Sequence, residues 1–137
     1  MDNMTKIQRS LTMSRIRSIE TKPEQKLRSY LHKAGYRFRK NVKDLPGKPD
    51  IVLAKYKTVI FVHGCFWHQH DNCPFAVKPK SNIDYWDKKL INNVVRDQAN
   101  IGSLELDGWR VIVVWECEIN RDIELVFPRI VSELLSD

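Results

Sequence analysis

The chain has 137 residues, of which 42% are hydrophobic and 29% are charged. This length and balance suit a single globular domain, residues 1–137, with a buried core. No apolar run approaches the roughly 20 residues that cross a bilayer, and the N-terminus lacks the apolar core of a signal peptide. We therefore expect no membrane partner and a cytoplasmic location.

The net charge of +6 is unevenly distributed along the chain. Residues 1–48 hold 13 Lys and Arg against 4 Asp and Glu, whereas the remaining residues hold 10 against 13. Such an asymmetry predicts a basic DNA-binding arm or short helix at residues 1–20 on a nearly neutral body, although a solvated surface would look the same.

The first clear helix is predicted to begin at Thr21, because Thr21 and Glu24 fit a capping box. Its apolar face contains Leu27, Tyr30, Leu31 and Ala34. Gly35 is expected to end the helix. Alternating apolar and basic residues then predict a strand over 36–39, and the sequence LPGKP at 45–49 predicts a turn.

Two β-rich runs follow at 50–54 and 58–63, with a tight connection that suits a hairpin. Residues 64–80 carry His, Cys, Pro and Asn without any period. An irregular loop of this length is usually functional or held by a metal.

A long helix is predicted over 82–106, a strand buried on both faces over 109–115, and a last helix over 122–135. The apolar positions of the long helix are Ile83, Trp86, Leu90, Ile91, Val94, Ile101 and Leu104. Those of the last helix are Ile123, Val126, Ile130, Val131 and Leu134. A strand–helix–strand crossover makes strands 58–63 and 109–115 parallel, so their carboxyl ends meet at one sheet edge. The sequence predicts an α/β fold with a central mixed sheet flanked by helices.

The three cysteines favour a metal site over disulfides, because an odd number without a leader does not suit a disulfide framework. Cys65 and Cys117 each follow one of the two parallel strands and should lie close together. Together with Cys73 and His70 they would form a closed tetrahedral zinc site. His68 is the alternative histidine ligand, and Asp71 is a weaker candidate. The alternative to a metal site is three unrelated small buried residues.

Asp50 opens an apolar strand and is the candidate ligand for a catalytic Mg²⁺, although turn chemistry alone explains many Pro-Asp pairs. If the hairpin forms, Asp50 and His63 lie at the same end of the sheet, with His68 a few residues further on. A neutral histidine there could accept a proton from water. Glu24 is either a capping residue or a further carboxylate for the metal or its waters.

Large aromatic side chains interrupt the polar loop at Phe66 and Trp67. Adjacent aromatics on a stiffened loop can wedge between base pairs. Trp86 could join them, but its helical position equally suits the core. Met13, close to two arginines in the basic arm, is a candidate for insertion into the minor groove.

Four segments carry a resemblance to a known family: PGKPDIVL, VIFVHGCFWHQHDNC, YWDKKLINNVVRD and LDGWRVIVVWEC. Together they resemble the very short patch repair (mismatch) endonucleases of bacteria, over about Lys6 to Cys117. The resemblance implies a restriction-endonuclease-like fold, catalytic Mg²⁺ and structural Zn²⁺. It also implies nicking of duplex DNA 5′ to the T of a T·G mismatch left by deamination of 5-methylcytosine.

The resemblance also assigns roles by position. It implies that Asp50 binds the catalytic metal, that His68 is the general base, and that His63 assists at the scissile phosphate. Glu24 would support the hydrated metal. The implied zinc ligands are Cys65, His70, Cys73 and Cys117, and the implied intercalating aromatics are Phe66, Trp67 and Trp86. The sequence departs from the family pattern at Val62 and by one extra residue between His70 and Cys73.

The expected partners are duplex DNA with a T·G mismatch, other mismatch-repair proteins and a repair polymerase, and the protein is expected to be a monomer. Two alternatives stay open. One is a zinc-dependent DNA-binding module without catalysis. The other is a restriction-type nuclease of the same fold without mismatch preference.

Overall fold

The computed structural model of the protein describes residues 22–71 and 73–136. The predicted arm at 1–20, with Met13, lies outside these residues, as does the capping residue Thr21. The elements in chain order are α2 (Lys22–Lys33), β1 (Arg39–Lys40), β2 (Ile51–Leu53), the 3₁₀ helix η1 (Ala54–Tyr56), β3 (Thr58–His63), the 3₁₀ helix η2 (Pro74–Ala76), α3 (Ile83–Leu106), β4 (Arg110–Trp115) and α4 (Glu116–Leu135).

The described part of the chain contains a four-stranded mixed sheet in the order β1-β2-β3-β4. β2 and β3 form the expected antiparallel hairpin, in which Ile51 is opposite Ile60. β3 and β4 are parallel and end together, with His63 beside Trp115. The predicted mixed sheet and its crossover are therefore confirmed, and residues that follow β3 and β4 leave the sheet at the same edge.

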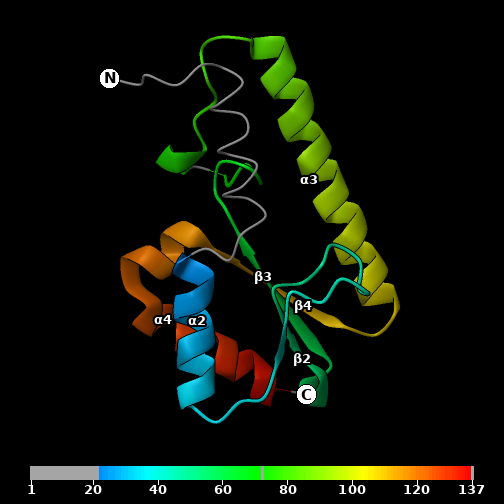
Figure 1. Cartoon of the computed structure of the whole chain (residues 1–137), viewed down its shortest axis with the longest axis vertical. Helices are drawn as coiled ribbons and strands as arrows, with labels where there is room; N and C mark the ends of the chain where they lie inside the picture. Colours follow the sequence, from blue (N-terminus) through cyan, green and yellow to red (C-terminus); the bar gives the residue numbers. More distant parts are fainter. Residues whose placement is uncertain (1–21, 72, 137) are drawn as a thin grey trace.

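Helices cover both faces of the sheet, with α2 and α4 on one side and α3 on the other (Figure 1). The strands alternate inward residues between the two faces, as the pleat requires. The core under α2 and α4 contains Leu27, Leu31, Ile51, Leu53, Ile60, Val62, Ile112, Val114, Ile119, Ile123, Val126, Ile130 and Leu134. The core under the end of α3 contains Val42, Val52, Val59, Phe61 and Leu104.

Only the last turns of α3 pack against the sheet, and its first half extends well beyond the sheet edge (Figure 1). The irregular loop that follows β3 lies beside this extended part (Figure 1). Two predicted apolar positions of the helix are accordingly solvent-exposed, Ile83 at 56% and Ile91 at 55%. The helical period alone could not reveal that half of this helix has no sheet to cover.

The last helix begins at Glu116, six residues before its predicted start. The N–H of Trp115 donates to the Glu118 carboxylate at 3.1 Å, which stabilises an extra first turn. Non-helical dihedrals at Asp122 then kink the helix. Cys117 therefore lies on a helical turn and not in the connecting loop that the sequence suggested.

Three smaller predictions were also wrong. Of the strand predicted over 36–39, only Arg39 pairs with β2. The observed strand β1 continues to Lys40, and residues 36–38 form no strand. β4 is not buried on both faces: only Ile112 and Val114 are fully buried, because β4 is an edge strand. Ala34 follows the end of α2 and is exposed.

Candidate active site and metal centre

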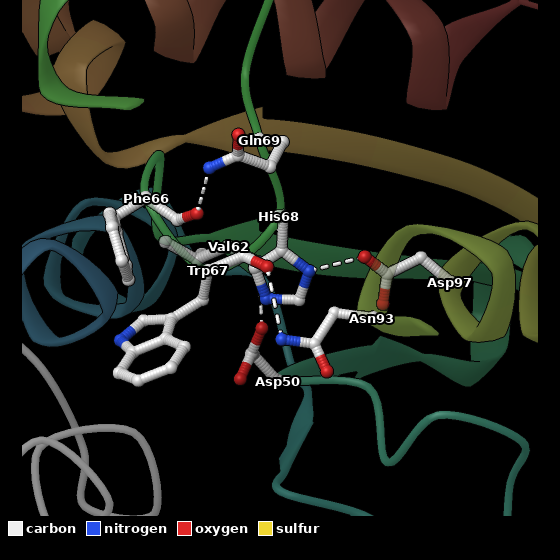
Figure 2. A network of polar contacts seen from close by, with 8 residues as sticks. All are labelled: Asp50, Val62, Phe66, Trp67, His68, Gln69, Asn93 and Asp97. Carbon is white, nitrogen blue, oxygen red and sulfur yellow. Dashed lines mark hydrogen bonds and ion pairs between the residues drawn. The ribbon is translucent and has the colours of Figure 1, made fainter. Parts of the chain in front are cut away.

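The Asp50 carboxylate is held at the sheet edge by a hydrogen bond from the neighbouring strand. It precedes β2, and its Oδ2 accepts the Val62 N–H at 2.6 Å (Figure 2). The antiparallel register of β2 and β3 causes this contact, because it brings the start of one strand to the end of the other. Asp50 therefore lies beside the residue that precedes His63.

A second carboxylate, Glu24, comes to Asp50 from the first turn of α2. Glu24 is only 8% exposed, and the Arg28 guanidinium one helical turn later donates to it at 3.3 Å. Burial, and next the charge of Glu24, raise the pKa of Asp50 to about 8, while the Val62 N–H opposes the shift. Two adjacent carboxylates that resist joint ionisation suit a divalent cation, whose charge removes the conflict.

The two candidate catalytic histidines are stacked on each other. The rings of His63 and His68 have centroids 3.9 Å apart and planes at 4°. His63 is buried, and burial followed by the charge of His68 lowers the pKa of His63 to about 3. His63 is therefore uncharged at neutral pH.

Asp97, from the middle of α3, pairs with His68. Its Oδ2 contacts His68 Nδ1, and Figure 2 shows the imidazole lying between the carboxylates of Asp97 and Asp50 in that view. A carboxylate at Nδ1 fixes the tautomer in which Nε2 has no proton and can accept one. One turn earlier, the buried Asn93 donates to the Trp67 carbonyl at 3.2 Å and holds the loop against α3.

A cluster of three thiols and one imidazole lies beside this group. The ligand atoms of Cys65, His70, Cys73 and Cys117 all lie within 4.8 Å of one another. His70 Nδ1 is 3.4 Å from Cys117 Sγ, and its ring stacks on Trp115 with centroids 4.1 Å apart. The structure thus brings His70, and not His68, to the thiols.

The chemistry of this donor set suits a soft metal. Burial and the neighbouring thiols raise the pKa of Cys65 to about 12, and burial also raises the pKa of Cys117. A cation shared by the three close thiols would favour the ionised form that Cys65 and Cys117 resist. Three sulfurs and one imidazole are the donors of closed, four-coordinate zinc sites.

Glu116 connects the two groups through the first turn of α4. Its half-buried side chain lies near Gly64 and close enough to His68 for the imidazole to act on its charge. Burial raises the pKa of Glu116, and the charge of His68 lowers it. The next residue is Cys117, so the first turn of α4 contributes to the surroundings of His68 and to the thiol cluster.

The aromatic side chains of the loop form a single cluster with Trp86 of α3. Phe66 and Trp67 have ring centroids 5.1 Å apart, and Trp86 lies 5.6 Å from Phe66 and 6.1 Å from Trp67. All three are partly exposed, so Trp86 is not a core residue. The Lys89 ammonium lies 5.8 Å from the Trp67 ring centroid.

Sequence reasoning missed Asp97, Asn93 and Glu116. A signal for the first two existed, because they occupy the same stripe of α3 as Leu90 and Leu104, where an apolar side chain is expected. No comparable pattern marks Glu116. Within residues 22–71 and 73–136, the predicted site residues lie in three sets of neighbours, which are Asp50 with Glu24, His63 with His68, and His70 with Cys65, Cys73 and Cys117.

Comparison with known proteins supports a nuclease. Residues 1–74 match the family model described as DNA mismatch endonuclease Vsr. Type II nicking enzyme V.NmeAIP of Neisseria meningitidis is 52% identical over 120 residues, which cover 88% of this chain and 85% of the relative. V.XorIIP of Xanthomonas oryzae, another type II nicking enzyme, is 49% identical over 119 residues, covering 87% of each chain.

DNA mismatch endonuclease Vsr of Escherichia coli is 42% identical over 132 residues, which cover 96% of this chain and 83% of the relative. These relatives contradict the alternative of a non-catalytic DNA-binding module. No helix among the described residues is both long and apolar enough to span a membrane.

From the family match and these three relatives, the chain belongs to the Vsr family of DNA mismatch endonucleases and is itself a DNA endonuclease.

Proposed function

We propose that the protein nicks one strand of duplex DNA on the 5′ side of the T in a T·G mismatch, in a reaction that depends on Mg²⁺. The observation that carries the proposal is that the end of β3 holds two groups. Val62 donates to Asp50, whose carboxylate contacts Glu24. The next residue, His63, stacks on His68, which pairs with Asp97. The relatives named nicking and mismatch enzymes support the same substrate class.

Asp50 would bind the Mg²⁺ directly, and Glu24 would hold its coordinated waters. When bound there, Mg²⁺ supplies a Lewis acid that polarises the phosphate and acidifies a coordinated water. The carboxylate of Asp50 is already oriented by the Val62 N–H, which lowers the entropy lost on binding. Val62 contributes this contact through its backbone, so its departure from the family pattern leaves the contact intact.

His68 would remove the proton from the attacking water at Nε2. Asp97 holds the opposite nitrogen, so the unprotonated nitrogen is presented to the site and the resulting imidazolium is stabilised. Uncharged His63 packs behind His68 and fixes its plane. We propose that His63 also assists at the scissile phosphate by hydrogen bonding.

The Cys₃His cluster would hold a structural Zn²⁺ through Cys65, His70, Cys73 and Cys117. Closed four-ligand coordination leaves no position for substrate, so its role would be to order the loop that carries His68 and the aromatics. Within the described part of the loop, the Gln69 amide also donates to the Phe66 carbonyl at 2.6 Å and to the Ala76 carbonyl at 3.3 Å.

Phe66, Trp67 and Trp86 would enter the base stack at the mismatch. A T·G pair is easier to unstack than a matched pair, so insertion of aromatic rings favours it. This would give the mismatch preference that separates the proposal from a restriction-type nuclease of the same fold. We propose that the protein works as a monomer, and that other mismatch-repair proteins and a repair polymerase act on the nicked product.

The position of the cut tests this proposal. Duplexes with one T·G pair are labelled at the 5′ end of either strand, incubated with Mg²⁺ and separated on a denaturing gel. We expect one product, from the T-containing strand, that ends immediately 5′ to the mismatched T. Cuts in both strands, or a cut that does not move when the mismatch is moved, would favour the restriction-type alternative.

A further inference from the structure

A second basic feature lies on the surface of α2. A groove of about 730 Å³ runs between α2 and the chain that follows it into β1. We call it the α2 groove. It is lined by Gln25, Arg28, Ser29, His32, Tyr36, Arg37, Phe38 and Lys40. In Figure 1 these segments run from blue to cyan.

The lining of the α2 groove suits an anion. Arg28, Arg37 and Lys40 are cationic, Gln25 and Ser29 offer neutral donors, and no carboxylate is among the described residues that line it. The surrounding sequence strengthens this field, because residues 22–48 hold nine Lys and Arg against two Asp and Glu. A groove of one charge sign concentrates a ligand of the opposite sign.

Another groove, along β4 and α4, shows the contrast. It has a volume of about 480 Å³ and is lined by two carboxylates, Glu118 and Glu133, besides Arg129. Since the carboxylates outnumber the arginine, that groove does not offer a positive field to a polyanion.

One wall of the α2 groove is shared with the candidate active site. Arg28 lines the groove and donates to Glu24 at 3.3 Å, and Glu24 contacts Asp50. A chain of phosphates lying in the groove would therefore come within a few side chains of the catalytic carboxylates. The positive charge of Arg28 lies between the two and would offset repulsion between such phosphates and Glu24.

The aromatic walls favour the sugar–phosphate backbone over bases. Tyr36 and Phe38 are partly buried against the core under α2 and α4, and Tyr36 packs on Tyr56 with ring centroids 5.8 Å apart. Both rings therefore pack partly into the protein, whereas single-stranded DNA sites present free aromatic faces to bases. The charged and hydrogen-bonding groups of the groove match phosphate oxygens instead.

We propose that the α2 groove binds the phosphodiester backbone of the DNA strand next to the scissile phosphate. The proposal rests on the proposed function, because that function places the scissile phosphate at Asp50. Contacts with phosphates carry no base information, so the groove would set the position of the duplex and leave mismatch choice to the aromatic loop.

Neutral substitutions of the exposed Arg37 and Lys40 test the groove. Arg37→Ala/Lys40→Ala removes two cations from the lining, whereas Lys26→Ala/Lys33→Ala removes two exposed cations of α2 that do not line it. Binding of T·G and matched duplexes is measured without Mg²⁺ over a range of salt. We expect the groove variant to lower the salt slope by about 1 to 2, since each phosphate contact contributes about 0.9. The control should change it by less than half as much, and equal slopes for the two variants would overturn the proposal.

Neutral methylphosphonates, placed singly in the substrate, locate the contact. Replacement of the phosphates next to the nick position should weaken DNA binding by wild type several-fold. The same replacement should have little effect on DNA binding by Arg37→Ala/Lys40→Ala. Equal losses in both proteins would also overturn the groove assignment. These binding measurements need no nicking, so they separate the two proposals. If wild type binds T·G and matched duplexes equally, while the groove variant still has a reduced salt slope, then the proposed mismatch recognition is wrong and the groove assignment is supported. Thermal unfolding confirms that each variant is folded.

Discussion

The imidazole of His63 stacks on that of His68, with ring centroids 3.9 Å apart and planes at 4°. Two charged imidazoles could not stay so close, and the low pKa of His63, about 3, keeps that ring neutral. The stack gives His68 an uncharged neighbour on one ring face, while Asp97 supplies a negative charge at the ring edge, at Nδ1. The predictions below follow from this arrangement and from the adjoining thiol cluster.

His63→Phe should make the protein less sensitive to acid. The pKa of His63 falls from 6.5 to about 3 on folding, so its stabilising effect is complete above pH 6.5 and is lost as the pH falls toward 3. Phenylalanine does not titrate. Between pH 6.5 and pH 4, the free energy of unfolding should therefore fall less in the variant than in wild type, by a difference of about 1 kcal/mol or more. Urea unfolding at several pH values measures this. The exposed His32→Gln variant should follow wild type, and a His63→Phe profile parallel to wild type would contradict the prediction.

Asp97→Asn should slow nicking without weakening DNA binding. The amide cannot hold the proton of His68 Nδ1 as a carboxylate does, so the productive tautomer is no longer enforced. We expect the single-turnover rate to fall by about 10²-fold or more, with an unchanged dissociation constant. Asp107→Asn, at the exposed end of the same helix, is the matched control. A rate within a factor of two of wild type would remove Asp97 from the site.

The two neighbouring loop histidines should differ in their effect on bound zinc. His70 lies with the thiols and His68 with Asp97, so His70→Asn and Cys117→Ser should lose zinc, whereas His68→Asn should keep it. Elemental analysis of the purified proteins measures the metal content. The zinc-free variants should also unfold at lower temperature, because the loop loses its cross-link to α4. Zinc retained by Cys117→Ser would exclude that ligand.

Phe66→Ala/Trp67→Ala should reduce mismatch preference more than general DNA affinity. These rings are two of the three in the aromatic cluster, and their removal leaves only Trp86 of the proposed wedge. We expect the ratio of nicking rates on T·G and matched duplexes to fall by at least about tenfold, whereas binding to matched duplex changes little. Fluorescence of 2-aminopurine beside the mismatch reports unstacking directly. Undiminished unstacking by the variant would show that other residues form the wedge.

Much of this site could be predicted because the fold brings distant segments together by simple rules. The crossover made β3 and β4 parallel, which was sufficient to bring Cys65 to Cys117. The hairpin was sufficient to place Asp50 beside Val62. In each case the register of neighbouring strands determines the contact, and periodicity and turn chemistry reveal that register.

Other parts depend on local geometry that the sequence does not encode in a pattern. His68 and His70 are two residues apart and would point the same way in an extended strand. Gln69 between them has a left-handed backbone, with φ +49°, so the two imidazoles reach different sites. Asp97 could not be paired with His68 for a similar reason, since 29 residues and a loop without any period separate them.

The central claim is that the Asp50 carboxylate supports Mg²⁺-dependent nicking at a T·G mismatch. The most direct measurement compares single-turnover nicking of T·G and matched T·A duplexes, with and without Mg²⁺, by wild type and by Asp50→Asn. The account predicts rapid nicking only for wild type with T·G and Mg²⁺, while Asp50→Asn binds the duplex but does not cut it. Nicking by Asp50→Asn at the wild-type rate, or equal wild-type rates on both duplexes, would contradict it.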